Sequence, residues 1–314
     1  MLRFFKSHWI AICGVGVGSV LIASPFFFAA FQGPAVDAQN AGQLGDFVGG
    51  YYGTIFLFAS VILLYVTLNA QRSAASDQSL ETRFFELVQM HRDNVSELEL
   101  GKSKGRKIFV LLIRELRAIL EHLPAVDLPE ITPLSRLQRL QVAYYVLFYG
   151  TGKNSSRALR GALADFQAPL VDAIERTFND PVLKQTVRKS RPFGYVPFEG
   201  HQSRLGHYYR HLYQAVRYVD EQDLNEDQKY EFVKTLRAQL TNHEQALLLV
   251  NSLTPLGHNW WRARLLTRFR MVQNIPKDFF NRSLELEVKT LFPSPYFEWE
   301  DPDPAGDGVV PKDV

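Results

Sequence analysis

Two long uncharged apolar stretches lie within the first 72 residues of this chain, at 9–31 and 47–68. As a helix that rises 1.5 Å per residue, each stretch is long enough to cross the roughly 30 Å hydrocarbon core of a bilayer. No later segment has a comparable uncharged run. The sequence therefore predicts a two-helix transmembrane hairpin over residues 1–72, followed by a polar domain.

The distribution of basic residues predicts how the hairpin is oriented. Arg3 and Lys6 precede the first span, Arg72 and Arg83 follow the second, and the connecting loop 32–46 has no Lys or Arg. Cytoplasmic flanks of membrane spans are enriched in Lys and Arg, so both termini are expected in the cytoplasm. A signal peptide is the alternative for the first span. Its apolar stretch is longer than a usual signal core, and no clean A-x-A cleavage site follows.

Small residues in both spans are spaced for helix packing. Gly14 and Gly18 form one G-x-x-x-G pair, and Gly49 and Gly53 form another. This spacing lets helix backbones approach closely in lipid, although glycine is also simply common in membrane helices. The spans contain no Asp, Glu, Lys or Arg, which disfavours a transporter or a proton relay.

Composition excludes several classes of protein. The chain has 314 residues, a formal net charge of +2 and one cysteine, Cys13, so a disulfide within one chain is excluded. We expect no metal site and no cofactor, and we assign no catalytic residue. Acidic residues gather with Pro and Gly in 293–314, which predicts a poorly ordered tail.

The polar domain, 73–292, is predicted to be helical almost throughout, so the fold class is mainly α. Apolar residues recur at helical spacing over most of this region, whereas β-like alternation is confined to one short segment, 193–198. The expected helices are 79–100, 107–123, 133–149, 156–177, 181–190 and 205–220, with a further helix of about thirty residues after Asn225.

The long helix after Asn225 carries an apolar seam with a polar line beside it. The seam consists of Leu236, Leu240, His243, Leu247 and Val250. The residues Arg237, Glu244 and Asn251 are spaced by seven and are expected to face one neighbouring element, plausibly the 205–220 helix with Arg210 and Asp220. Such a line commonly fixes helix register, and a functional polar cleft is the alternative.

Four motifs in this order give the chain a family resemblance. They are Gly45 to Gly50, Phe84 to Leu87 with His91, Gly206 to Tyr213 with Tyr218 to Asp220, and Leu236 to Leu240 with Glu244, Leu247 to Leu249 and Asn251. In these residues the chain resembles the AbiC-like phage abortive infection proteins, over most of 44–251. It departs mildly from the pattern at Tyr209 and Thr241, where Phe and Ser are expected.

The resemblance implies a bacterial, membrane-anchored defence protein that kills or arrests an infected cell before phage mature. Together with the two predicted spans, this predicts a multi-pass protein of the bacterial inner membrane. The resemblance predicts a biological process but no biochemical activity, because the molecular activity of the family is poorly defined. The 260–270 segment and the acidic tail lie outside the motifs that carry the resemblance.

One pair of histidines and two Arg–His pairs are candidate chemical sites. His207 and His211 are four residues apart and could share a metal on one helix face, but no carboxylate stands at ligand spacing. Arg117 with His122, and Arg237 with His243, resemble the Arg–His pairs of helical HEPN ribonucleases, in which Arg holds phosphate and His transfers protons. A structural or hydrogen-bonding role is the simpler account of His207 and His211, and burial on the predicted seam is the simpler account of His243. Helix-rich sequences also produce such Arg–His spacings by chance.

Two segments are rich in basic residues. The first has Trp260, Trp261, Arg262, Arg264 and Arg268 and is expected to form an amphipathic helix. It could dock within the protein with its Arg side chains paired, lie on a membrane surface, or bind a nucleotide or nucleic acid. The second is the cluster Lys102, Lys104, Arg106 and Lys107, which is expected to be a solvated turn.

The leading functional hypothesis is a non-enzymatic effector. Its cytoplasmic domain would hold the hairpin silent, and an infection signal would release the hairpin to damage the membrane. A membrane-tethered RNase, or a sensor or scaffold that recruits a separate toxin, are the alternatives. The expected partners are the lipid bilayer, a second copy or a protein of the same defence operon, and a nucleotide or nucleic-acid trigger.

The predicted topology can be tested with compartment reporters. Because basic residues flank both spans and are absent from 32–46, fusions at Asn40 and Ser76 should report opposite sides of the membrane. Reporters that give the same compartment at both positions would refute the hairpin.

Overall fold

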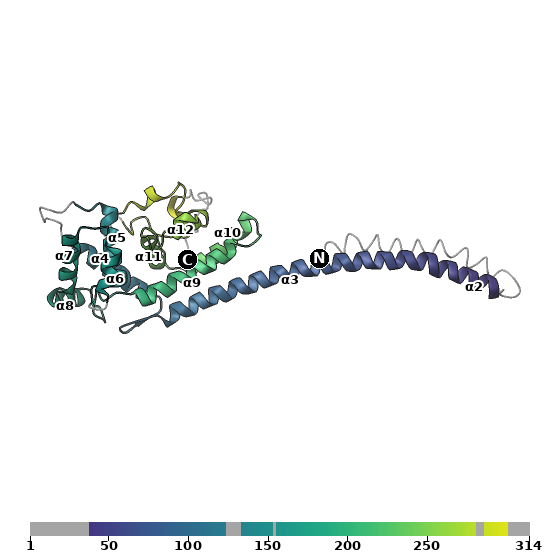
Figure 1. Ribbon diagram of the computed structural model, residues 1–314, viewed down its shortest axis with the longest axis horizontal. Helices are drawn as coiled ribbons and strands as arrows, with labels where there is room; N and C mark the ends of the chain where they lie inside the picture. The colour runs from purple at the N-terminus through teal and green to yellow at the C-terminus, as the bar shows by residue number, and fades with distance from the viewer. Residues whose placement is uncertain (1–37, 124–132, 153–154, 281–285, 301–314) are drawn as a thin grey trace, which may run out of the picture. The chain divides into compact units, whose positions relative to one another are not determined.

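The computed structural model describes residues 38–123, 133–152, 155–280 and 286–300, and within them the fold is mainly α (Figure 1). The chain divides into two compact units, 1–83 and 84–314, which are described separately. The elements are α2 Ala38–Phe47, η1 Val48–Tyr52, α3 Gly53–Glu97, β1 Glu99–Leu100, β2 Ser103–Lys104, α4 Lys107–His122, α5 Arg136–Tyr149, α6 Ser156–Ala162, α7 Ala168–Asn179, α8 Pro181–Ser190, α9 Gln202–Asp220, α10 Glu226–Arg237, α11 Asn242–Ser252, α12 Asn259–Arg262, α13 Leu265–Arg268, η2 Val288–Leu291 and η3 Glu298–Glu300.

The first unit is helical from Ala38 onward, so part of the predicted loop 32–46 is helix instead. One helix in the described part of the chain, Gly45–Glu97, is long and apolar enough to cross a membrane, and it contains the predicted second span. None of the residues in its most apolar stretch is buried. The first predicted span, with Gly14 and Gly18, lies outside the described residues.

Large apolar side chains are exposed all around this helix rather than along one stripe, as expected of a helix that crosses a bilayer. They include Ile55, Phe56, Leu57, Phe58, Val61, Ile62, Leu63, Leu64, Tyr65, Val66 and Leu68. The hydroxyls of Ser60 and Thr67 each donate to the carbonyl oxygen four residues earlier, at 2.7 Å, which satisfies them without water.

The second unit is built around α11. Every residue from Glu244 to Ser252 is buried, because α11 packs against α4 and α5, which also pack against each other (Figure 1). The end of α3 contributes Phe84, Val88 and Val95 to the same hydrophobic core. The ring of Phe84 meets that of Phe232 on α10 edge to face, with 5.1 Å between centroids.

Capping explains where the helices of the second unit begin. Capping boxes start α5 at Ser135 with Gln138, α10 at Asn225 with Gln228, and α11 at Thr241 with Glu244. The predicted thirty-residue helix after Asn225 is therefore wrong, because α10 ends at Arg237 and α11 begins at Asn242. The predicted seam lies on both helices and their connection, and Leu236, Leu240, Leu247 and Val250 are all buried.

Three further expectations are corrected. The helix predicted over 156–177 is two helices, α6 and α7, because Pro169 lies in the first turn of α7 and cannot stand inside a longer helix. The strand predicted at 193–198 is irregular, and the described strands are instead β1 and β2. The predicted tail starts too early, because Tyr296 and Phe297 are buried in the core.

A close backbone crossing fixes the 191–201 loop on the end of α5. Gly150 has φ +78°, and a Cβ there would lie 2.3 Å from the carbonyl carbon of Glu199. Gly200 has φ +87°, and a Cβ there would lie 2.2 Å from the carbonyl oxygen of Tyr149. Only glycine allows both this conformation and this approach.

The crossing places His201 beside a fully buried carboxylate, Glu115 of α4. His201 Nε2 lies 2.9 Å from Glu115 Oε2, the Tyr195 hydroxyl donates to that oxygen at 2.6 Å, and the Phe198 amide donates to Oε1 at 2.7 Å. Burial alone would raise the pKa of Glu115, but His201 and the hydrogen bonds outweigh it and hold the pKa below its usual value. Sequence reasoning did not identify this cluster.

Glu115→Gln should destabilise the full-length protein in detergent by about 2 to 3 kcal/mol at pH 7, because charge-assisted hydrogen bonds are lost. Since the pKa of Glu115 is lowered on folding, its contribution is complete above the usual Glu pKa of about 4.3 and is lost as the pH falls below that value. The difference in Tm between wild type and Glu115→Gln should therefore shrink in acid. Glu121→Gln, on the exposed side of α4, is the control and should cost about 1 kcal/mol or less. A pH-independent difference would contradict the assignment.

Candidate functional site

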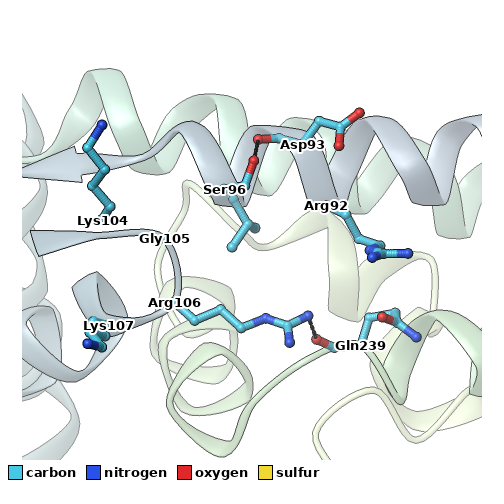
Figure 2. A pocket seen from close by; sticks show the side chains of 9 residues that line it. Arg92, Asp93, Ser96, Lys104, Gly105, Arg106, Lys107 and Gln239 are labelled. Carbon is cyan, nitrogen blue, oxygen red and sulfur yellow. Dashed lines mark hydrogen bonds between the residues drawn. The ribbon is translucent and has the colours of Figure 1, made fainter.

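A basic pocket lies where the end of α3, the β1–β2 hairpin and the start of α4 meet the α10–α11 connection (Figure 2). Its volume is about 610 Å³, within the range of ligand sites in proteins. The basic pocket is lined by Arg92, Asp93, Val95, Ser96, Lys104, Gly105, Arg106, Lys107 and Gln239. Four cationic side chains thus share this hollow with one carboxylate.

Local turns bring these cations together. The two-residue strands pair Glu99 with Lys104 and Leu100 with Ser103, and Gly101, with φ +60°, closes the turn between them. Gly105, with φ +62°, then redirects the chain into α4. Lys102, Lys104, Arg106 and Lys107 are all exposed, as expected of a solvated turn. The structure adds that the turn belongs to a short hairpin followed by the start of α4, and that three of the four cations line the pocket.

Arg106 connects the pocket to the α10–α11 connection. Its Nη2 donates to the carbonyl oxygen of Gln239 at 2.8 Å, as Figure 2 shows, and its Nε lies 3.9 Å from Glu244 Oε2. The Arg106 side chain is half-exposed, whereas that of Glu244 is 1% exposed. One arginine therefore joins the open pocket to a buried carboxylate.

Glu244 is held by the helix that it caps and by α9. Its Oε2 accepts from the Thr241 amide at 2.8 Å and hydroxyl at 2.7 Å, and its Oε1 lies 3.4 Å from the Tyr208 hydroxyl. Burial raises the pKa of Glu244 above its usual value, against the opposing effects of Thr241, Arg106 and Tyr208. The carboxylate is thus positioned by three elements of the fold.

Behind Tyr208 lies His91, on α3. The two rings are 5.1 Å apart between centroids, and His91 is only 2% exposed. Neither ring nitrogen of His91 has a hydrogen-bond partner among the described residues. Burial, followed by the charges of His211 and Arg106, lowers the pKa of His91 to about 4, so it is neutral at pH 7. A chain of contacts therefore runs from Arg106 through Glu244 and Tyr208 to His91.

The predicted polar line is not one network. Arg237 donates to the carbonyl oxygens of Phe269 and Arg270 at 3.0 and 3.2 Å, and its guanidinium lies over the ring of Tyr230. Asn251 donates to the Tyr144 hydroxyl at 2.9 Å. Arg237, Glu244 and Asn251 are all buried, but they have separate partners because the helix breaks between the first two.

The 260–270 segment is two short helical turns rather than the single amphipathic helix that we expected, because Arg264 adopts a left-handed conformation with φ 55° between α12 and α13. Trp260 is buried and Trp261 partly buried, whereas Arg262 and Arg264 are exposed. The burial of Trp260 docks this segment within the protein, and contact of the exposed arginines with a membrane or a nucleotide stays a prediction.

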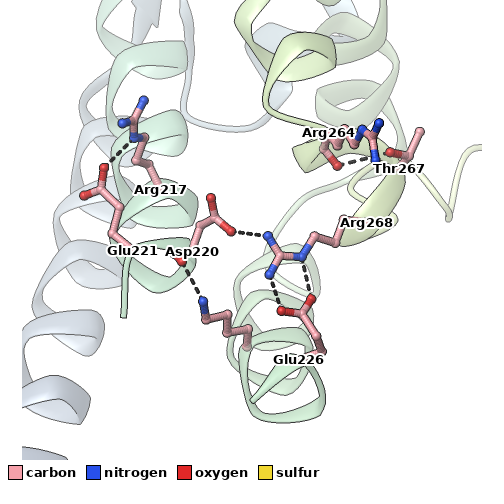
Figure 3. A network of polar contacts seen from close by, with 8 residues as sticks. Arg217, Asp220, Glu221, Glu226, Arg264, Thr267 and Arg268 are labelled. Carbon is pink, nitrogen blue, oxygen red and sulfur yellow. Dashed lines mark hydrogen bonds and ion pairs between the residues drawn. The ribbon is translucent and has the colours of Figure 1, made fainter. Parts of the chain in front are cut away.

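Arg268 of this segment forms ion pairs with Asp220 at the end of α9 and Glu226 at the start of α10 (Figure 3). We expected Arg210 and Asp220 to face the polar line on the helix after Asn225, but Asp220 pairs with Arg268 instead and Arg210 is exposed on α9. The structure thus joins two residues that the sequence placed in separate groups.

The histidine pairs form no assembled site in the described residues. His207 and His211 stack with 6.5 Å between ring centroids, and no group of three or more metal-ligating side chains occurs in the described part of the chain. Arg117 and His243 both face Phe279, with Arg117 Cζ 5.3 Å from the ring centroid. His122 is exposed at the end of α4, and Arg237 is engaged elsewhere.

No described side chain or other segment would lie within 4 Å of a Cβ at Gly49 or Gly53, apart from the adjoining residues of the chain. Their role in helix packing therefore stays a prediction.

Comparison with protein-family models matches residues 200–280 to the family described as "Putative phage abortive infection protein". The match supports the resemblance over that segment, which contains the motifs on α9 and α10–α11 and also the 260–270 segment that we had placed outside the family pattern. The similar stretches at 45–50 and 84–91 lie outside the match. No curated protein and no solved structure matches the chain.

The separation of Arg237 from Glu244 predicts additive destabilisation. Arg237→Ala and Glu244→Ala should each cost about 2 to 4 kcal/mol in the full-length protein, because each leaves buried polar groups unpaired. The two residues share no partner, so the double variant should equal the sum of the single variants within about 0.5 kcal/mol. Chemical denaturation monitored by tryptophan fluorescence would measure this. A double variant that costs clearly less than the sum would restore the single network expected from the sequence.

Proposed function

We propose that this chain is a membrane-anchored anti-phage protein of bacteria whose helical unit controls a membrane-damaging segment. The match of residues 200–280 supports a role in abortive infection. In this proposal the chain is a multi-pass inner-membrane protein with both termini in the cytoplasm, and the bilayer is its first partner. A second copy, or a protein of the same defence operon, is the expected protein partner.

The observation that carries the proposal is the dual character of α3. Around residues 55–68 its large apolar side chains are exposed on all sides, which is unfavourable in water by about 25 cal/mol per Å² of apolar surface. From Phe84 onward the same helix supplies side chains to the core of the second unit. A bilayer would cover the first part, and a structural change in the core would then act on a helix that continues into the membrane.

An effector that damages the membrane is favoured over the tethered RNase. The arginines of the two Arg–His pairs contact other residues, since Arg117 lies over the ring of Phe279 and Arg237 donates to the carbonyl oxygen of Phe269. The apolar helix has no evident role in RNA cleavage. The sensor or scaffold hypothesis shares the anchor with the effector but not the membrane damage, so a direct measurement of membrane potential separates the two.

Leu57→Arg/Leu64→Arg should abolish both membrane insertion and protection against phage. Both side chains are exposed on the apolar part of α3, and an arginine near the bilayer centre costs about 2.5 to 3.5 kcal/mol. The measurements are membrane fractionation, phage plating efficiency and membrane potential during infection. Wild-type cells should be protected and should depolarise after infection.

Ser73→Arg/Ser76→Arg is the matched control, because it adds the same charges to exposed positions of α3 beyond the span and should leave protection intact. Protection by a chain that lacks residues 1–75 would defeat the membrane proposal. Protection without depolarisation would contradict the effector hypothesis and favour a sensor or scaffold.

A further inference from the structure

We infer that the basic pocket is a binding site for an anion that carries at least two neighbouring phosphate groups. Its volume of about 610 Å³ could hold such a group, and four cationic side chains line it against the single carboxylate of Asp93. Cations that line one hollow raise the local concentration of anions more than scattered surface charges do.

The cations retain unused hydrogen-bond donors. Neither Arg92 nor Lys107 has an ion-pair or hydrogen-bond partner for its side chain among the described residues. Lys104 pairs with Glu99, but both side chains are more than 60% exposed, and such a pair is readily exchanged. Arg106 has further N–H groups besides those directed at Gln239 and Glu244, and a guanidinium can bind phosphate through two parallel hydrogen bonds.

The start of α4 adds to the positive potential. Gly105, Arg106 and Lys107 line the pocket where this 16-residue helix begins. No side chain caps the helix at Arg106, and its first turn has no acidic residue. The partial positive charge of the helix terminus therefore adds to that of the four side chains and favours an anion.

The lining indicates recognition of phosphates rather than of bases. None of the described residues that line the pocket is an aromatic on which a base could stack, and Val95 is the one aliphatic side chain among them. Single-stranded nucleic acids usually bind by base stacking together with phosphate contacts, so the pocket is poorly suited to them. A free diphosphate or nucleotide, or the headgroup of a lipid with two phosphates, has the required chemistry.

Binding would also change the contacts of Arg106. A phosphate that draws the guanidinium toward the pocket competes with the Gln239 carbonyl and with Glu244, which in turn contacts Tyr208 in front of His91 on α3. Occupancy of the pocket would thereby reach the helix that continues into the apolar segment. This consequence rests on the proposed function, whereas the binding itself does not.

Calorimetry with inorganic pyrophosphate tests the site on the full-length protein in phosphatidylcholine nanodiscs. Wild type should bind, and Arg92→Gln/Lys107→Gln should bind at least about tenfold more weakly, since it removes two unpaired cations from the pocket. Lys102→Gln/Arg157→Gln removes the same two kinds of charge from exposed positions outside the pocket and should change affinity by less than about twofold. All variants should keep the wild-type melting temperature.

Three results would overturn the inference: no binding to wild type, unchanged binding to Arg92→Gln/Lys107→Gln, or an equal loss in the control.

Repeating the titration in discs that contain cardiolipin separates the sources of phosphate. If cardiolipin weakens pyrophosphate binding to the wild type, and does so only when Arg92 and Lys107 are present, the site binds a lipid headgroup. If cardiolipin leaves the pyrophosphate affinity unchanged, the site binds a free ligand. Phage plating of the same variants is scored separately, so a failed pocket leaves the membrane proposal standing.

Discussion

The buried carboxylate of Glu244 is the contact on which the second unit depends. It starts α11, the helix around which the core is built, and it also meets Tyr208 of α9 and Arg106 at the start of α4. A carboxylate that is 1% exposed is tolerated only where hydrogen bonds and a cation compensate for lost water. Satisfying this one group therefore fixes how three elements meet, and it places the basic pocket directly against the segment that matches the abortive infection family.

Much of the helical architecture could be predicted from local sequence. The bounds of α4, α8 and α9 agree with the apolar periodicity, and Asn225 caps α10 as expected. The main wrong prediction is the thirty-residue helix after Asn225, because its apolar and polar repeats continue across a capping signal. Thr241 and Glu244 have the T-x-x-E spacing that starts a helix, and Pro169 likewise marks the start of α7. Both signals are visible in the sequence, and both outweigh periodicity because they determine which backbone groups are hydrogen-bonded.

The basic pocket and its neighbouring contacts were harder to predict from the sequence, because they join residues that are far apart in the chain. The basic cluster was evident, but the bond from Arg106 to Gln239 spans 133 positions, and no local pattern indicates it. The pairing of Arg268 with Asp220 and Glu226 depends on the left-handed turn at Arg264, which is unusual for a non-glycine residue. In the sequence His91 stands out only as part of a family motif. Its burial against Tyr208, with no hydrogen-bond partner among the described residues, follows from the contact of α3 with α9.

The central claim is that an anion bound in the basic pocket changes the structure of α3, through the contacts that join Arg106, Glu244, Tyr208 and His91. Hydrogen–deuterium exchange of the full-length protein in nanodiscs, with and without pyrophosphate, tests it directly. The account predicts altered protection in 84–91 of α3 and in 241–247, which lie outside the pocket, in addition to the segments that line it, 92–96, 104–107 and 239. A change confined to the lining segments, with 84–91 and 241–247 unaltered, would contradict it.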